Sequence, residues 1–168
     1  MENVLNVAQF IIDEYEKMTG NTEKIDEMKL HKLLYLSQRE SLAILGEPLF
    51  KENFEGWRYG PVCREVRTYF TKDGLQCNTS EISNEAAYIV RSILEQYGCI
   101  ESWKLSELTH NEISWKNARE GLKPSQNGNK VLLLDDIRKD AEKIRPYDTV
   151  WDMYYDEFED ADEEVQEE

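Results

Sequence analysis

The sequence has few of the residues on which metal sites, disulfide frameworks and membrane spans depend. Its 168 residues include three cysteines and two histidines, and they contain no run of eighteen apolar residues. Cys63, Cys77 and Cys99 lack the spacing of a zinc site or a disulfide framework, so we expect reduced thiols and no bound metal. The start of the chain lacks a basic segment followed by an apolar one, which argues against secretion. We therefore expect a cytoplasmic protein without a cofactor or a membrane contact.

Basic residues are absent from the last part of the chain, and this absence dominates the charge. The whole sequence carries a net charge of −15, from 35 acidic and 20 basic side chains. Residues 146–168 hold eleven of the acids and no Lys or Arg, which leaves 24 acids against 20 bases, or −4, for the rest. Phosphate neutralisation needs clustered Lys and Arg, so direct nucleic-acid binding is not expected. The acidic tail instead favours a partner protein with a basic surface.

One stretch contains the signals of a long helix with both ends marked. Asp26 is placed to cap the first turn, and Gly46 followed by Pro48 is placed to end the helix. Between these ends, apolar and small residues recur at three- and four-residue steps, namely Leu30, Leu33, Leu34, Ser37, Ser41, Leu42 and Leu45. This pattern predicts a core helix that the other segments cover.

Three polar residues of this helix have two interpretations. If the leucines face inward, Lys29, His31 and Lys32 lie on a solvated face, which is the usual position of such side chains. Alternatively, two bases flanking a histidine form a site for a phosphate or a carboxylate.

Shorter helices are predicted around the central one from apolar periodicity, at residues 3–19, 83–97, 103–110, 115–121 and 135–145. Pro61 is predicted to open another helix, because proline suits the first helical position. Residues 71–82 are expected to form a loop, and residues 131–134 a short strand or a buried connector.

These elements predict a mainly α fold with two or three short strands. We expect a single compact helical domain over residues 1–146, organised around one long central helix, and an acidic aromatic extension over residues 147–168, with the last ten residues disordered.

Two further polar and aromatic groups are open to a functional interpretation. Trp57 and Tyr59 precede Gly60 and Pro61, and this corner either packs Trp57 on the core or binds an anion at a helix start. Next to Thr109, His110 and Glu112 resemble an acid–base pair, but no nucleophile lies nearby in the sequence. We therefore expect the His110 ring to bond a backbone group and hold the loop before Trp115, and we expect no enzymatic activity.

The tail combines aromatic residues with carboxylates. Positions 150, 154 and 158 fall at four-residue steps, as do 151 and 155, so a short amphipathic helix would have two apolar edges. The aromatics either dock on the domain or anchor a partner, because Trp and Tyr concentrate binding energy while carboxylates steer a basic surface. On the second interpretation the candidate contact residues are Trp151, Tyr154, Tyr155, Asp156, Glu157 and Phe158.

Three blocks of sequence agree in order and spacing with a known family. They are residues 28–38 (MKLHKLLYLSQ) with 46–50 (GEPLF), residues 55–62 (EGWRYGPV) continuing to 66, and residues 105–110 (LSELTH) with 115–119 (WKNAR). Across roughly residues 4–145 the chain resembles the Panacea domain, the antitoxin-like domain of the SocA/GepA type found in bacterial and phage toxin–antitoxin operons. It departs from the family at Ser114, where the family usually has proline, and serine still suits a helix cap there.

The resemblance implies an antitoxin that neutralises a cognate toxin by direct protein binding, and it implies no catalytic residue. The motif residues are expected to be structural, namely Lys32, Tyr35, Trp57, Tyr59, Gly60, Pro61, Thr109, His110 and Trp115. Two alternatives stay open. One is an acidic inhibitor that imitates nucleic acid, as in phage counter-defence, and the other is an adaptor that delivers the toxin to a cytoplasmic protease.

Overall fold

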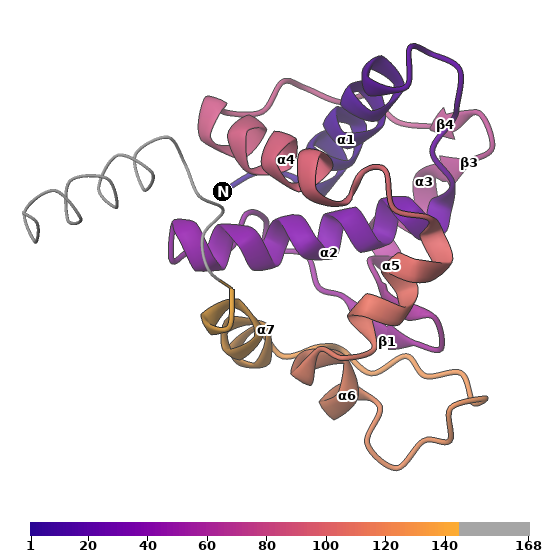
Figure 1. Ribbon diagram of the computed structural model, residues 1–168, viewed down its shortest axis with the longest axis vertical. Helices are drawn as coiled ribbons and strands as arrows, with labels where there is room; N and C mark the ends of the chain where they lie inside the picture. Colours follow the sequence, from indigo (N-terminus) through magenta and orange to yellow (C-terminus); the bar gives the residue numbers. More distant parts are fainter. Residues whose placement is uncertain (145–168) are drawn as a thin grey trace, which may run out of the picture.

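The computed structural model describes residues 1–144, in which six helices and two small hairpins surround one long helix (Figure 1). The elements in chain order are α1 (Val4–Met18), α2 (Glu27–Ile44), β1 (Glu55–Trp57), β2 (Gly60–Val62), α3 (Arg64–Tyr69), β3 (Phe70–Thr71), β4 (Gly74–Leu75), α4 (Asn84–Tyr97), α5 (Ser102–Thr109), α6 (Ile113–Ala118) and α7 (Leu134–Glu142). The mainly α fold predicted from the sequence is confirmed.

The central helix α2 has the predicted ends. The Asp26 carboxylate accepts a hydrogen bond from the Lys29 backbone N–H at 2.9 Å, and Gly46 has a φ of +73° just beyond the last turn. In Figure 1, α1 and α4 lie on one side of α2, while α5, α6, α7 and β1 lie on the other. Helix α2 packs against α1, α4, α5, α7 and β2, so covering elements surround it.

The hydrophobic core forms around the apolar side chains of α2. Leu30, Leu33, Leu34 and Leu36 are fully buried, together with side chains from α1, α4 and the segment after α2. Burial of each such side chain stabilises the fold by about 1.5–3 kcal/mol, so these contacts dominate the cohesion of the domain. The predicted core helix is therefore confirmed.

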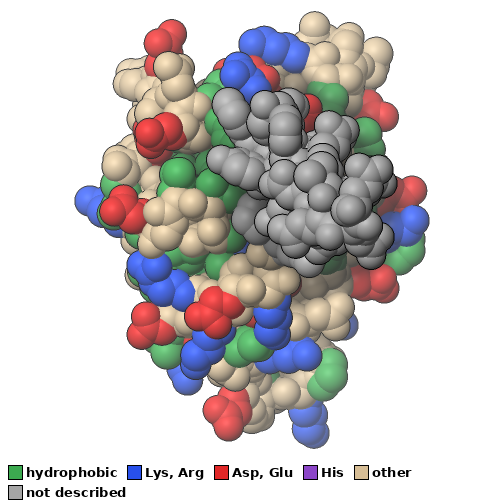
Figure 2. All heavy atoms as spheres, turned by 60° about the vertical axis from the view of Figure 1, so that its left-hand side comes forward, with side chains coloured by type: hydrophobic (Ala, Val, Ile, Leu, Met, Phe, Trp, Pro, Cys, Tyr) green, Lys and Arg blue, Asp and Glu red, His purple; other side chains and the backbone are tan. Residues whose placement is uncertain are grey.

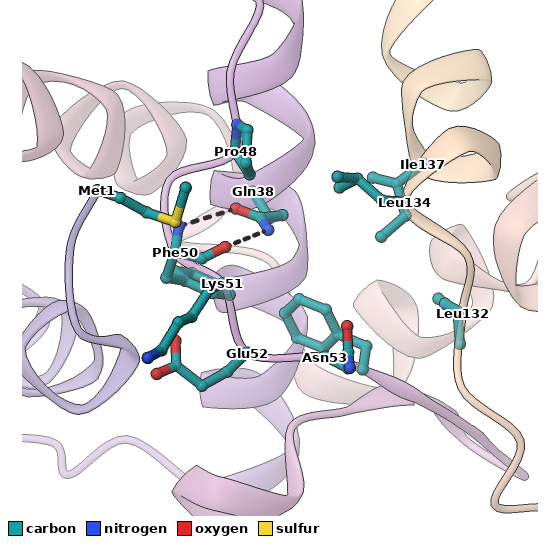
Figure 3. A pocket seen from close by; sticks show the side chains of 11 residues that line it. Met1, Gln38, Pro48, Phe50, Lys51, Glu52, Asn53, Leu132, Leu134 and Ile137 are labelled. Carbon is teal, nitrogen blue, oxygen red and sulfur yellow. Dashed lines mark hydrogen bonds between the residues drawn. The ribbon is translucent and has the colours of Figure 1, made fainter.

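Gln38 on α2 fixes the path of the chain after the helix. Its amide oxygen accepts from the Leu49 N–H at 2.7 Å, and its amide nitrogen donates to the Phe50 carbonyl at 2.9 Å. Figure 3 shows the Gln38 amide in contact with the Phe50 backbone, beside a cavity of about 210 Å³ that is lined mainly by apolar side chains. A buried side-chain amide thus replaces a sheet ladder as the partner of this extended segment.

The predicted helix start at Pro61 is wrong, because Pro61 lies in strand β2. Strands β1 and β2 pair antiparallel, with Glu55 opposite Val62 and Trp57 opposite Gly60. The φ of Gly60 is +112°, a conformation that closes the tight turn and that other residues rarely adopt. Helix α3 begins only at Arg64. The predicted loop over residues 71–82 is interrupted at its start, where β3 and β4 form a second hairpin with residues 72 and 73 at its turn; residues 76–82 contain no helix or strand.

The last two helices begin differently from the prediction. Helix α6 starts at Ile113, two residues before the predicted Trp115, and α7 starts at Leu134. Asp135 and Asp136 lie in the first turn of α7 and do not cap it. The predicted strand or buried connector over residues 131–134 is wrong for most of its length: Leu132 is buried and Val131 bridges Glu55, but Val131 and Leu133 are 40% and 61% exposed and Leu134 already belongs to α7.

The described surface has mixed charge. On the face shown in Figure 2, Lys and Arg side chains are interspersed with Asp and Glu side chains over the coloured part of the surface. Within residues 1–144, no helix combines the length and the apolar character needed to cross a membrane.

Candidate functional site

The expectation that Lys29, His31 and Lys32 lie on a solvated face is wrong. Their exposed fractions are 7%, 2% and 1%, because elements pack around the whole circumference of this part of α2. Lys29 donates from Nζ to the Gly98 carbonyl at 3.0 Å, at the end of α4. The structure therefore places a row of polar groups inside the protein, where each needs a partner.

Lys32 is the most deeply buried cation of the row. Its Nζ atom donates to the Pro61 carbonyl in β2 at 3.1 Å, which is its one hydrogen bond to a described residue. Burial lowers the pKa of Lys32 to about 7, and the carboxylates of Asp26 and Glu27 act in the opposite direction. An ammonium group has three N–H donors, so two of them remain for another acceptor.

The β1–β2 hairpin reaches Lys32 because residue 60 has no side chain. A Cβ atom on Gly60 would lie 2.6 Å from Lys32 Cε and 2.6 Å from Thr109 Oγ1. Ser106 in α5 donates to the Tyr59 carbonyl at 2.6 Å and fixes the turn from the other side. Residues of all three family-like blocks therefore meet around Gly60.

His31 is held as a neutral ring with a defined tautomer. Its Nδ1 atom accepts from the Cys63 N–H at 3.2 Å, so the proton is on Nε2, which faces Glu27 Oε1 at 3.3 Å. Burial lowers the pKa of His31, and the nearby Lys32 and Arg67 lower it further. The ring thus ties the start of α3 to the first turn of α2.

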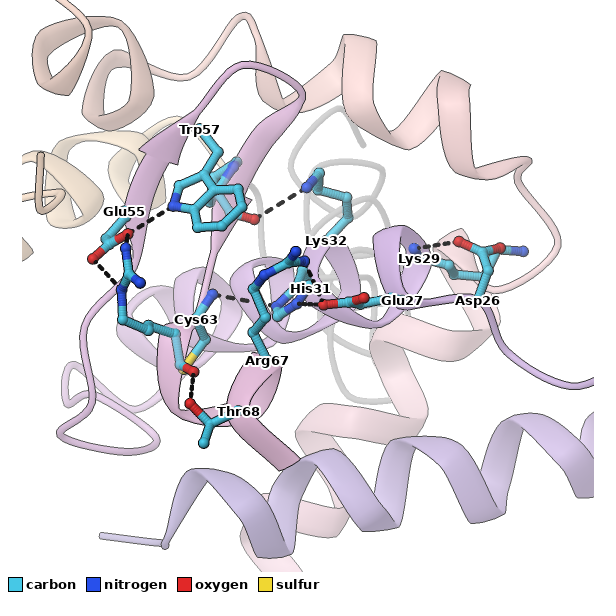
Figure 4. A network of polar contacts seen from close by, with 12 residues as sticks. Asp26, Glu27, Lys29, His31, Lys32, Glu55, Trp57, Cys63, Arg67 and Thr68 are labelled. Carbon is cyan, nitrogen blue, oxygen red and sulfur yellow. Dashed lines mark hydrogen bonds and ion pairs between the residues drawn. The ribbon is translucent and has the colours of Figure 1, made fainter. Parts of the chain in front are cut away.

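The Glu27 carboxylate and two arginines, Arg64 and Arg67, lie beside the His31 ring or the Trp57 ring. The Arg67 guanidinium donates to Glu27 Oε1 at 2.9 Å, and the hydrogen bond from His31 together with Arg67 lowers the pKa of Glu27 despite its partial burial. Arg67 and Arg64 also lie over the Trp57 ring, with their Cζ atoms 4.8 Å and 5.7 Å from its centroid. Figure 4 shows these groups on the hairpin, α2 and α3.

The interpretation in which Trp57 packs on the core is wrong. Trp57 is half-buried and does not belong to the hydrophobic core cluster; its indole Nε1 donates to Glu55 Oε2 at 2.7 Å. The short β1–β2 hairpin keeps the ring at the surface, where arginine side chains cover it.

A cavity of about 380 Å³ lies between α2, the hairpin and α3, and we call it the Lys32 cavity. Its lining includes one acidic side chain, two aromatic rings and three basic side chains, namely Glu27, Trp57, Tyr59, Lys32, Arg58 and Arg67. Figure 4 shows Trp57, Lys32 and Arg67 around the same space, with His31 beneath it. This is the arrangement of a binding site, with apolar walls and a few convergent polar groups.

His110 and Glu112 do not form an acid–base pair. The His110 ring stacks on Trp115, with centroids 4.2 Å apart and planes 12° apart. Burial lowers the pKa of His110, as do Lys32 and Arg119. The Glu112 carboxylate instead binds Arg39 at 2.8 Å, on the far side of the loop. The stacking places the His110 ring against α6, and the bond from this ring to a backbone group of the loop stays a prediction.

The sequence analysis missed a second buried polar cluster, centred on the Tyr35 hydroxyl. This oxygen lies 2.9 Å from Ser114 Oγ, 3.1 Å from Asp140 Oδ2 and 3.2 Å from Glu112 Oε2. Asp140 also accepts from the Ile113 and Ser114 N–H groups, at 2.7 Å and 3.0 Å. The cap of α6 therefore comes from α7, and Ser114 lies inside the helix rather than capping it.

The predicted contact residues of the tail lie outside the described residues. These are Trp151, Tyr154, Tyr155, Asp156, Glu157 and Phe158, within the predicted extension over residues 147–168.

The sequence analysis had not connected Glu27 and Arg67 with Trp57. The sequence did contain one local signal for the contact between Glu27 and His31, because residues four apart in a helix lie next to each other on the same face.

A family model described as "Antitoxin SocA-like, Panacea domain" matches residues 30–116, which is just over half of the chain. This range contains most of α2, the hairpin, α3, α4 and α5, and therefore most of the Lys32 cavity. No curated protein and no solved structure matches the chain.

Proposed function

Because the chain belongs to the SocA-like antitoxin family with a Panacea domain, we propose that it neutralises a cognate toxin protein by binding to it directly. The family match over residues 30–116 is the observation that carries this proposal. On this view the protein acts as a binding module and not as an enzyme.

The packing of the motif residues supports a rigid binding platform. Lys32, Tyr35 and Thr109 are buried, and the side chain of each makes at least one hydrogen bond inside the domain. A platform of this kind presents its surface without a large ordering cost, which favours tight association.

We assign part of the toxin contact to the acidic extension. Its aromatic residues would anchor the partner, and its carboxylates would steer a basic toxin surface toward them. The candidate residues are Trp151, Tyr154, Tyr155, Asp156, Glu157 and Phe158. The choice rests on sequence, because eleven acidic and no basic residues lie between positions 146 and 168.

A growth assay with the co-expressed toxin, encoded by the neighbouring reading frame, tests both parts of the proposal. The full chain should restore growth, whereas a chain ending at residue 146 should protect less well. The triple variant Trp151→Ala, Tyr154→Ala and Tyr155→Ala should also lose protection. The matched control is Trp103→Ala, which removes an aromatic side chain that is 55% exposed on the described domain and should protect fully.

Two measurements complete this test. Circular dichroism should show unchanged helical content in the truncated chain, so that a loss of protection reports lost binding. The toxin should co-purify with the full chain and keep its half-life in cells; a shortened half-life would instead indicate delivery to a protease. Failure of the full chain to bind or protect would contradict the proposed function, and full protection by the truncated chain would remove the tail from it.

A further inference from the structure

The Lys32 cavity concentrates positive charge in a protein whose net charge is negative. Three of its lining residues are basic and one is acidic, and the acidic residue, Glu27, is already bound to Arg67 and His31. We propose that this cavity binds a small molecule that carries a carboxylate or phosphate group on a flat, apolar body. This proposal goes beyond toxin neutralisation and does not depend on it.

The charged end of the ligand follows from the unused hydrogen-bond donors. Lys32 Nζ has one acceptor among the described residues, the Pro61 carbonyl, and no described residue accepts a hydrogen bond from the Arg58 side chain. An ammonium buried to 99% with a single neutral partner is costly in the interior. An anion at the inner end of the cavity would give it the opposite charge that it lacks, and Arg58 would add a charge-assisted hydrogen bond from the rim.

The flat, apolar end follows from the walls. Trp57 and Tyr59 line the cavity with two rings, while Met28 and Val62 add aliphatic surface. Tyr59 is 53% exposed, so part of its ring remains available for contact with a ligand. Planar ligands stack favourably on such rings, and removal of this aromatic area from water would supply much of the binding free energy.

The size and composition of the space favour a ligand of about the size of a substituted benzene ring. The cavity of about 380 Å³ falls at the lower end of the usual range for small-molecule sites. The cavity beside Gln38 measures about 210 Å³ and has one basic side chain, Lys51, in its lining. It has two phenylalanine rings in its lining, but it lacks the convergence of several cations that distinguishes the Lys32 cavity.

The probes for the test are phenyl phosphate and benzoate, with benzyl alcohol as the uncharged probe of similar shape. A ¹H–¹⁵N spectrum of the full-length protein reports binding through the indole N–H signal of Trp57, assigned with the Trp57→Phe variant. We expect saturable shifts with phenyl phosphate, benzoate or both, and at least tenfold weaker binding of benzyl alcohol. The relative affinities of the two anions distinguish a phosphate site from a carboxylate site.

The key variant is Lys32→Met, which removes the charge and keeps most of the side-chain volume. Loss of a charged hydrogen bond should weaken binding of the anionic probes about ten- to a hundredfold. Lys116→Met, at an exposed position outside the cavity, should bind like the wild type. If Lys32→Met fails to fold, Arg58→Gln at the exposed rim replaces it and should weaken binding several-fold.

Calorimetry adds a readout that a structural role of Lys32 would not change. An anion that stabilises the Lys32 ammonium should draw a proton from solution near pH 8, so the observed enthalpy should depend on the ionisation enthalpy of the buffer. Two results would overturn the proposal: no shift of the Trp57 signal with either anion, or equal affinity in the wild type and the charge-removing variant.

Discussion

At the scale of single residues, the unusual feature is the number of polar side chains buried on α2. Lys32 places an amine beside a backbone carbonyl, and Tyr35 places a hydroxyl among a serine and two carboxylates. Burial and the neighbouring Glu112 and Asp140 raise the pKa of Tyr35, while burial raises the pKa of Glu112 itself. Each group costs free energy to desolvate, so these contacts specify one arrangement of the surrounding helices more than they add stability.

The buried amine predicts a characteristic pH dependence of stability. Burial lowers the pKa of Lys32 to about 7 in the folded state, against about 10.4 in the unfolded chain. Between these values the unfolded state binds more protons, so the free energy of unfolding should rise with pH, by at most about 1.4 kcal/mol per pH unit. The lowered pKa of Glu27 keeps it ionised in this window, and the lowered pKa values of His31 and His110 keep both rings neutral, so these three groups do not contribute.

The Lys32→Met variant isolates this effect, because methionine carries no proton that changes with pH. Urea unfolding followed by circular dichroism should show the variant more stable than the wild type at pH 7. The advantage should shrink by about 2 kcal/mol between pH 7 and pH 9. Parallel pH profiles for the two proteins would contradict a depressed Lys32 pKa.

At the scale of elements, the β1–β2 hairpin makes the candidate site. It contributes Trp57 and Tyr59 to the cavity, and its Pro61 carbonyl accepts from Lys32. The hairpin lies close to α2 because Gly60 leaves room for the Lys32 side chain and Thr109. Trp115 donates to the Trp57 carbonyl at 2.8 Å and thereby ties α6 to β1.

The second hairpin supplies a matched control for the role of Gly60. Gly60→Ala introduces strain at a φ of +112° and a Cβ atom 2.6 Å from two side-chain atoms. Gly74→Ala introduces similar strain at a φ of +103°, but nothing lies within 4 Å of the new Cβ. Both changes should lower the free energy of unfolding by roughly 1–3 kcal/mol through strain, and Gly60→Ala by about 1–3 kcal/mol more through overpacking.

Chemical denaturation of the two alanine variants measures this difference. A larger loss for Gly60→Ala would show that close approach to Lys32, in addition to the backbone conformation, requires glycine. Equal losses would contradict the close approach of the hairpin to α2.

At the scale of the whole molecule, charge is divided between a nearly balanced domain and an acidic extension. Residues 1–145 carry −4 and residues 146–168 carry −11. The described surface mixes both signs, as Figure 2 shows for one face. Long-range attraction to a basic partner would therefore come mainly from the extension.

This division predicts how toxin binding depends on salt, given the proposed direct contact. Replacement of the acids in residues 159–168 by Gln and Asn should slow association about tenfold at 50 mM salt, because steering raises encounter rates. At 500 mM salt the two rates should converge, since charges are then screened over a few ångströms. Stopped-flow or surface-plasmon measurements give both rates, and an association rate independent of salt for the full chain would contradict steering.

Local signals in the sequence predicted much of the fold and little of the site. The cap at Asp26, the stop at Gly46 and the apolar periodicity act within a few residues, and they placed α1, α2, α4 and α5 correctly. The predicted helix start at Pro61 was wrong because proline is suited both to the first position of a helix and to the strand position that it occupies here. The pairing of Trp57 with Gly60 decided between them.

The sequence by itself determined a mainly α domain around one leucine-rich helix, its family, and the concentration of acidic residues at the end of the chain. The tertiary structure decided the rest, because burial depends on which segments cover a helix. The Lys32 contact joins residues 29 positions apart, and the contact from Tyr35 to Asp140 spans 105 positions. Helical periodicity describes one face of one element, whereas the elements packed around the full circumference of α2 turned its expected solvated face into the wall of a cavity.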